Sequence, residues 1–85
     1  MKQFEYVITD PVGIHARPAG LLVKEAKQHE SKIMVRKGDK SADATRMMSV
    51  MGLGAKCGDT LTVTIEGADE EAAAAALEQF LKDNL

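Results

Sequence analysis

Aromatic residues and cysteines are scarce in this chain of 85 residues, which has two phenylalanines, one tyrosine, no tryptophan and one cysteine. A single thiol, Cys57, cannot close an internal disulfide, so the disulfide-stapled class of small secreted domains is excluded. Cys57 and the two histidines also lack any recognised ligand spacing, so a structural zinc site is not indicated. We therefore expect a domain that holds neither a metal nor a cofactor.

The chain also lacks long hydrophobic runs and a large excess of charge. No apolar run is long enough to span a bilayer and no charged-then-apolar leader opens the sequence, so we predict no membrane insertion and a cytoplasmic location. The net charge is −2 and no aromatic residues alternate with basic ones, which argues against nucleic-acid binding. Residues 1–65 nevertheless carry ten basic and seven acidic side chains, whereas residues 66–85 carry one and six. An acidic partner for the basic part is the better expectation.

The composition is that of one small globular domain spanning residues 1–85, with 45% apolar and 28% charged residues. Residues 2–8 alternate with the period of a half-buried strand, which Asp10-Pro11 ends. From Ala16 the apolar residues recur every three or four positions, which predicts an amphipathic helix. Pro18 falls in its first turn, where a missing N–H costs nothing.

The second half of the chain continues with a similar mixture of elements. Residues 32–44 predict a hairpin around the turn-like Lys37-Gly38-Asp39, and residues 46–53 favour a short helix. Residues 60–66 alternate without fault and predict a strand, after which Asp69 is expected to cap a final helix. The order β-α-β-β-α-β-α predicts an α+β fold in which helices cover one face of an antiparallel sheet.

The stretch GIHARPAG, residues 13–20, carries the strongest indication of chemistry. It places His15 at the mouth of the first helix, where unpaired backbone N–H groups and the positive dipole end suit an anion such as phosphate. Imidazole is a nucleophile at neutral pH and forms covalent intermediates, while Arg17 adds a permanently charged donor for phosphate oxygens. From these residues alone, a phosphoryl site and a lone surface histidine at a turn are equal alternatives.

Other motifs are weaker. His29 lies near the end of the first helix with no neighbouring acid or nucleophile that makes a site, so it is interpreted as structural. The stretch GLGAKCG is spaced G-x-G-x-x-x-G and follows a predicted helix, so it is not a dinucleotide-binding loop. No nucleophile elbow or zinc-protease motif is present, and an independent hydrolase is not supported.

Three methionines crowd the predicted short helix at positions 47, 48 and 51. Methionine in such a helix is more often core filler than interface. Beside a thin core, however, at least one of the three is a candidate for an exposed apolar patch that docks a partner. Arg17, Lys24 and Lys27 recur on the outer side of the first helix and can rim such a patch, although a solvated face is the usual meaning of these charges.

The chain resembles the HPr family, the histidine-containing phosphocarrier proteins of the phosphoenolpyruvate-dependent sugar phosphotransferase system (PTS). GIHARPA is similar to the family's active-site motif, KSADATRMMSVMGLGAKCGD to its middle region and TVTIEGADEEAAAAALEQF to its last strand and helix. The resemblance spans essentially all 85 residues. It implies an open-faced β-sandwich with a four-stranded antiparallel sheet covered by three helices.

The same resemblance implies a function. His15 would accept a phosphoryl group on ring Nδ1 from phosphorylated enzyme I and pass it to the enzyme IIA component of a sugar permease. Arg17 would contact the phosphoryl group, helped by the backbone N–H groups of Ala16 and Arg17. The protein would then be a phosphoryl carrier and not an independent enzyme. By position, the partner-facing surface consists of Gly20, Lys24, Lys27, Met47, Met48, Met51 and Gly54.

Two positions depart from the family pattern. Many Gram-positive members carry a regulatory serine, phosphorylated by the HPr kinase/phosphorylase, where this chain has Arg46, so we predict that this kinase does not modify it. Thr45 and Ser49 flank Arg46 but do not occupy the matching place. Val12 stands where the family often has a small polar residue near the phosphorylated ring, so the stability of the phosphohistidine or its transfer rate is expected to differ.

Alternatives to a sugar-PTS carrier stay open at this point. An HPr-like carrier of a regulatory, nitrogen-related branch would use the same chemistry with different partners. A binding module would dock a regulator through the methionine patch and leave His15 incidental, and a small independent phosphotransferase would need a second catalytic group that the sequence does not offer. A monomer is expected for a carrier that presents one face to successive partners.

Overall fold

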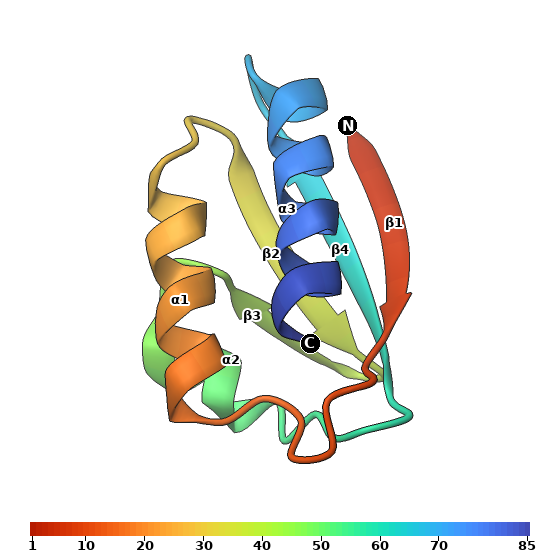
Figure 1. Cartoon of the computed structure of the whole chain (residues 1–85). Helices are drawn as coiled ribbons and strands as arrows, with labels where there is room; N and C mark the ends of the chain where they lie inside the picture. The colour runs from red at the N-terminus through yellow and green to blue at the C-terminus, as the bar shows by residue number, and fades with distance from the viewer.

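The computed structural model describes all residues, 1–85, as a four-stranded sheet with three helices packed against one of its faces (Figure 1). Along the chain the elements are β1 (Lys2–Val7), α1 (Ala16–Lys27), β2 (Lys32–Lys37), β3 (Lys40–Asp43), α2 (Met47–Gly52), β4 (Thr60–Glu66) and α3 (Glu70–Asn84). The predicted α+β class and the order β-α-β-β-α-β-α are confirmed.

The sheet has the strand order β1-β4-β2-β3, and all neighbouring strands are antiparallel. The last strand of the chain therefore lies inside the sheet, with Val63 paired to Phe4 of β1 on one side and to Val35 of β2 on the other. Since Val7 at the end of β1 pairs with Thr60 at the start of β4, residues 8–15 and 53–59 emerge at the same end of the sheet. The first turn of α1 and the last turn of α3 meet them there (Figure 1).

The core lies between the sheet and the helices, and it follows the alternation of the strands. On β4, Leu61, Val63 and Ile65 are fully buried, whereas the threonines between them are only half-buried. Small side chains on α1 and α3, such as Ala19 and Ala73, let these helices pack closely against the sheet. Nineteen buried hydrophobic residues form one contiguous cluster. Burial of each of its leucine, isoleucine or valine side chains contributes about 1.5–3 kcal/mol to folding.

The capping of α3 differs from the sequence prediction. Asp69 occupies the N-cap position of α3, but its side chain makes no hydrogen bond to the first turn of that helix. Its carboxylate instead accepts the backbone N–H groups of Glu30 (3.0 Å) and Ser31 (2.9 Å) and the Ser31 hydroxyl. The expected cap was wrong because this carboxylate ties α3 to the turn between α1 and β2, a contact 38 and 39 residues away in sequence.

None of the helices has both the length and the apolar character needed to cross a membrane. The longest is α3, with 15 residues.

Candidate functional site

His15 is the N-cap residue of α1, with an extended backbone (φ −127°, ψ −172°). Its carbonyl oxygen accepts the first bond of the helix, from the N–H of Ala19 at 2.9 Å, while its ring makes no capping hydrogen bond. Pro18 contributes no N–H, so the amides of Ala16 and Arg17 are the donors left at this helix end. The half-buried imidazole is thus placed by the backbone and remains available for chemistry.

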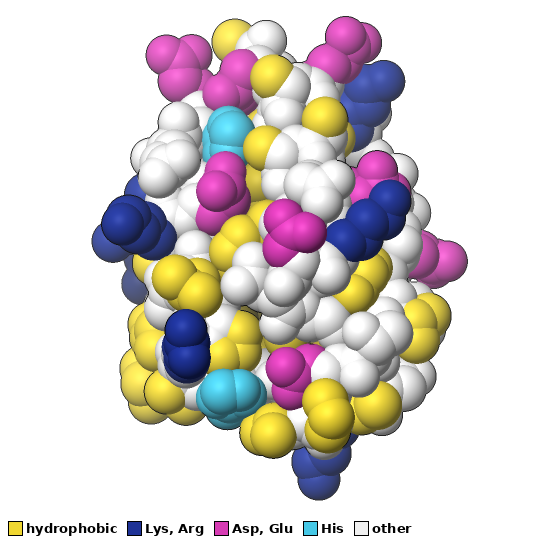
Figure 2. Space-filling view, in the orientation of Figure 1, with side chains coloured by type: hydrophobic (Ala, Val, Ile, Leu, Met, Phe, Trp, Pro, Cys, Tyr) yellow, Lys and Arg dark blue, Asp and Glu magenta, His cyan; other side chains and the backbone are white.

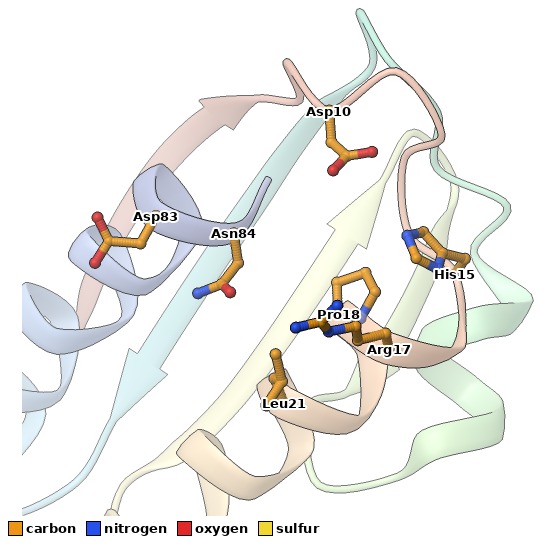
Figure 3. Close-up of a pocket in the computed structure, with 7 residues that line it drawn as sticks. All are labelled: Asp10, His15, Arg17, Pro18, Leu21, Asp83 and Asn84. Atoms are coloured by element: carbon orange, nitrogen blue, oxygen red, sulfur yellow. The ribbon is translucent and has the colours of Figure 1, made fainter.

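An open cavity of about 240 Å³ lies beside the His15 ring (Figure 3). Arg17 lines it and forms no ion pair with any acidic side chain. In Figure 3 the Arg17 side chain extends toward the end of α3 and away from His15. A guanidinium without an ion-pair partner at the edge of a cavity can donate hydrogen bonds to an anion that enters the cavity. The lining residues are Asp10, His15, Arg17, Pro18, Leu21, Asp83 and Asn84.

The loop before His15 is fixed by backbone hydrogen bonds. The Asp10 carboxylate accepts the N–H groups of Val12 (2.9 Å) and Gly13 (3.2 Å), and the Ile14 N–H donates to the Ala55 carbonyl (2.9 Å). Gly13 has φ +81°, in the left-handed region that favours glycine. This loop therefore has one defined course into α1. The side chain of Val12 is 65% exposed and offers the imidazole no hydrogen bond.

Sequence reasoning missed four lining residues of the cavity. Asp10 is predicted from the sequence only as the end of the first strand, and Leu21, Asp83 and Asn84 are not singled out. Asp83 and Asn84 reach the cavity because the C-terminal turn of α3 lies near the N-terminal turn of α1, more than 60 residues earlier in the chain. No local pattern signals such a meeting of two helix ends.

The two helices that carry most of the expected partner surface, α1 and α2, contact each other. A Cβ atom at Gly20 would lie 3.8 Å from the methyl carbon of Met47, an ordinary van der Waals distance, so Gly20 and Met47 are neighbours across the two helices. Met48 is 78% exposed, while Met47 and Met51 are half-buried against the core. The expectation of an exposed methionine is confirmed for Met48. Lys24, Lys27 and Gly54 are also exposed.

This region forms part of a mixed surface. Figure 2 shows hydrophobic side chains gathered around the lower end of the molecule, where α1 begins, with a histidine among them. Acidic side chains are more numerous toward the upper end. The end of the molecule that carries His15 therefore combines apolar area with basic groups.

Arg46 occupies the N-cap position of α2 and makes no capping hydrogen bond with its side chain. The neighbouring Thr45 is engaged, because its hydroxyl and its N–H both donate to the Asp43 carboxylate, at 2.6 and 2.9 Å. These bonds, the one from the hydroxyl above all, lower the pKa of Asp43, and the charge of Arg46 adds to the effect. Ser49 is exposed on α2.

His29 lies at the other end of α1 and does not belong to this site. Its Nε2 is 2.8 Å from Oε2 of Glu25, and its Nδ1 is 3.7 Å from Oδ2 of Asp69. Helix periodicity places Glu25 one turn away from His29 and the fold adds Asp69, but His29 lines no cavity where these carboxylates could form a site. The ring is 15% exposed and joins α1 to the start of α3, in keeping with a structural interpretation.

Comparisons with known proteins bear on this geometry. The sequence model of the family described as "PTS HPr component phosphorylation site" matches residues 2–83. The phosphocarrier protein HPr of Mycoplasma genitalium is 41% identical over 85 residues, which cover 99% of this chain and 97% of that protein. The chain belongs to the HPr family. It is accordingly a phosphocarrier of the PTS, and proteins of that system are its partners. Neither a nitrogen-related branch nor a pure binding module is favoured by these matches.

Solved HPr structures share the fold. An HPr from Thermoanaerobacter tengcongensis has a TM-score of 0.93 and 37% identity, covering 99% of this chain and 94% of its own. A dimer of HPr from the same organism has a TM-score of 0.77 and 37% identity, covering 98% of this chain and 95% of its own. The open-faced sandwich expected from the resemblance is confirmed.

Proposed function

We propose that His15 is the residue that carries the phosphoryl group, taking it on Nδ1 from phosphorylated enzyme I and giving it to enzyme IIA of a sugar permease. The observation that supports this most strongly is the position of His15 at the start of α1, beside an open cavity and with a ring free of capping bonds. His29, the other histidine, is held between two carboxylates and faces no cavity.

Charge and position support a role for Arg17 and two amides in holding the phosphoryl oxygens. A phosphoryl group on His15 would lie near the N–H groups of Ala16 and Arg17, which have no partner within the helix. Arg17 lines the same cavity and makes no ion pair, so its guanidinium is free to turn toward a phosphoryl group on His15. Transfer then rests on positioning and charge, without a metal or a cofactor.

The carrier chemistry is tested by mixing the protein with phosphoenolpyruvate and enzyme I, followed by intact mass and ³¹P NMR. We expect one acid-labile phosphoryl group that is absent in His15→Ala and present in His29→Ala. Both variants should be shown to be folded. Phosphorylation of His15→Ala, or its loss in His29→Ala, would assign the chemistry to the wrong histidine and reject the proposal.

We also propose that the surface around Met48 docks both partners. It comprises Gly20, Lys24, Lys27, Met47, Met48, Met51 and Gly54. The exposed Met48 on α2 and the exposed lysines of the neighbouring helix α1 would supply the adaptable apolar centre and the basic edge of such an interface. The partners would present acidic surfaces to it.

Met48→Ala tests this surface. Truncation of a central interface residue costs roughly 1–2 kcal/mol, so we expect the KM for enzyme I to rise by about tenfold. Since Met48 is exposed, the free energy of unfolding should change by less than about 0.5 kcal/mol. Val7→Ala, which truncates an apolar side chain 52% exposed on β1, is the matched control and should leave KM unchanged. Equal KM values for the two variants would place docking elsewhere.

Arg46 bears on regulation. Because an arginine occupies the place of the regulatory serine, and the Thr45 hydroxyl is bonded to Asp43, we propose that HPr kinase/phosphorylase does not modify this chain. Incubation with that kinase and ATP should give no added mass. Labelling at Thr45 or Ser49 would show that the kinase accepts a neighbouring hydroxyl.

We further propose that the carrier acts in the cytoplasm as a monomer. A carrier that offers one face to successive partners has no need of a second copy. Light scattering should give the mass of one chain at micromolar concentration. A stable dimer in solution, like the one solved for the relative from Thermoanaerobacter tengcongensis, would contradict this.

A further inference from the structure

The end of α3 is bonded directly to the loop that leads to His15. The main-chain oxygen of Leu85 accepts three hydrogen bonds, from the N–H of Thr9 (2.6 Å), the N–H of Asp10 (2.8 Å) and the Thr9 hydroxyl (2.9 Å). Leu85 itself is fixed, because its side chain is only 4% exposed within the core and its N–H donates to the Leu81 carbonyl at 2.7 Å. The buried C-cap residue of α3 thus fixes Thr9 and Asp10 near the start of the loop.

From Asp10 the constraint continues toward His15. The Asp10 carboxylate binds the N–H groups of Val12 and Gly13, and the Asp10 carbonyl also accepts the Gly13 N–H at 3.1 Å. The next residue, Ile14, is bonded to Ala55. A displacement of Asp10 would therefore move the turn that precedes His15.

The same helix end also faces the cavity beside the imidazole. Asp83 and Asn84 line that cavity, and the Asn84 side-chain amide is oriented by a 2.9 Å bond to the Phe80 carbonyl (Figure 3). Leu85 anchors the loop while the two preceding residues form a wall of the site. The three bonds to Leu85 therefore connect the loop before His15 to this wall.

We infer that the last turn of α3 positions His15 for phosphoryl transfer, with Leu85 as the anchor and Thr9 and Asp10 as the positioning residues that transmit it. The inference rests on the proposed role of His15 and extends it. It assigns to the Thr9 hydroxyl an effect on transfer that is separate from partner docking, since Thr9 does not belong to the docking surface around Met48.

The test compares four proteins as substrates of enzyme I: the wild type, Thr9→Val, Thr9→Ser and Thr62→Val. Thr9→Val removes one of the three donors at nearly constant size, and Thr9→Ser keeps it. Thr62→Val is the matched control, because Thr62 is a half-buried threonine of β4 whose side chain makes no hydrogen bond. The maximal rate, the KM, the half-life of the phosphohistidine and the NMR shifts of residues 12–15 are measured together with the melting temperature.

A single hydrogen bond is worth about 0.5–1.5 kcal/mol, so we expect Thr9→Val to lower the maximal rate by about two- to tenfold. Its KM should stay that of the wild type, and the amide shifts of residues 12–15 should move. Thr9→Ser and Thr62→Val should both match the wild type in rate. A change in melting temperature alone, without a change in rate or shifts, would be the mark of a merely structural bond.

Two results would overturn the inference while leaving the proposed function intact. One is a Thr9→Val protein with the rate and phosphohistidine half-life of Thr62→Val, and the other is a change confined to KM, which would place Thr9 in docking. If the wild type itself takes no phosphoryl group on His15, the proposed function fails, and the inference fails with it.

Discussion

Gly13 is the residue whose replacement the site loop can least accommodate. Its φ is +81°, and a Cβ atom there would lie 2.5 Å from the Ala55 carbonyl oxygen and 2.6 Å from Cα of Lys56. Both contacts are with backbone, which cannot rotate away. The close approach holds the His15 loop against residues 53–59.

We predict that Gly13→Ala lowers the free energy of unfolding by about 2–4 kcal/mol, because a left-handed backbone and a steric overlap add together. Gly38→Ala is the control, since Gly38 also has a positive φ (+58°) but nothing within 4 Å of the added carbon. It should lose only about 1 kcal/mol. Urea unfolding of the two variants measures the difference, and equal losses would mean that the loops separate easily.

Asp10 contributes two hydrogen bonds to the loop and a negative charge in the cavity that His15 also lines. Asp10→Asn keeps an oxygen that can accept the N–H groups of Val12 and Gly13 but removes the charge. A carboxylate near a phosphoryl group repels it, and a partly exposed pair of this kind contributes about 0.5–1 kcal/mol. We therefore predict that the half-life of the phosphohistidine increases by about two- to fivefold in Asp10→Asn.

The decay of the ³¹P signal at fixed pH measures this half-life. Asp39→Asn, in the turn between β2 and β3, is the control and should decay like the wild type. A shorter half-life in Asp10→Asn would indicate that the hydrogen bonds of the loop, and not the charge, dominate the effect of this residue.

At the scale of elements, the junction of α1, β2 and α3 depends on Asp69. Its carboxylate accepts the Ser31 hydroxyl and the N–H groups of Glu30 and Ser31, and these bonds hold its pKa below the ordinary value of 3.8. A carboxyl whose pKa is lower in the folded state stabilises the fold at pH values above its ordinary pKa. This stabilisation is lost as the pH falls through the folded-state pKa.

We predict that Asp69→Asn is less stable than the wild type at pH 7 and that the difference shrinks when both are unfolded near pH 2.5. Denaturant unfolding at the two pH values measures it, with Asp39→Asn as the control that should show no such change. A difference independent of pH would mean that the shape of the side chain, and not its charge, holds the junction.

Periodicity in the sequence was enough to predict the elements themselves. The alternation of residues 60–66 predicted β4, and Ala16 and Pro18 marked the start of α1, because strand and helix periods and first-turn preferences are local properties. The proposed site residue, His15, was also suggested by a local motif. These predictions needed no knowledge of how the elements meet.

What the sequence could not predict depends on contacts between distant segments. The Asp69 carboxylate looked like a cap for its own helix, yet in the folded chain it bonds to residues 30 and 31. Asp83, Asn84 and Leu85 belong to the surroundings of His15 only because α3 ends there. Such pairings are set by how the helices pack on the sheet, which no local pattern reveals.

At the scale of the whole molecule, the net charge of −2 conceals an uneven distribution, with the basic residues in excess over residues 1–65. Attraction between the basic side chains of residues 1–65 and an acidic partner accelerates association, and salt screens this attraction. We predict that the association rate with enzyme I falls as ionic strength rises, and that Lys24→Gln and Lys27→Gln weaken this dependence.

Stopped-flow mixing over a range of salt concentrations measures the dependence. Lys2→Gln is the control, because Lys2 lies at the far end of β1 and pairs with Glu71 at 3.6 Å. A salt dependence that all three variants share with the wild type would mean that the lysines of α1 do not steer the encounter.

The strand order also has a consequence for synthesis on the ribosome. His15 is made early, but β4 joins β1 to β2 and comes only after residue 59, and the loop before His15 needs both Ala55 and Leu85. In a nascent chain whose α3 has not yet left the ribosome, the loop before His15 therefore lacks its hydrogen bonds to Leu85. We therefore expect truncated translation products to be poor phosphoryl acceptors, so that only chains whose synthesis has reached α3 take part in phosphoryl flow.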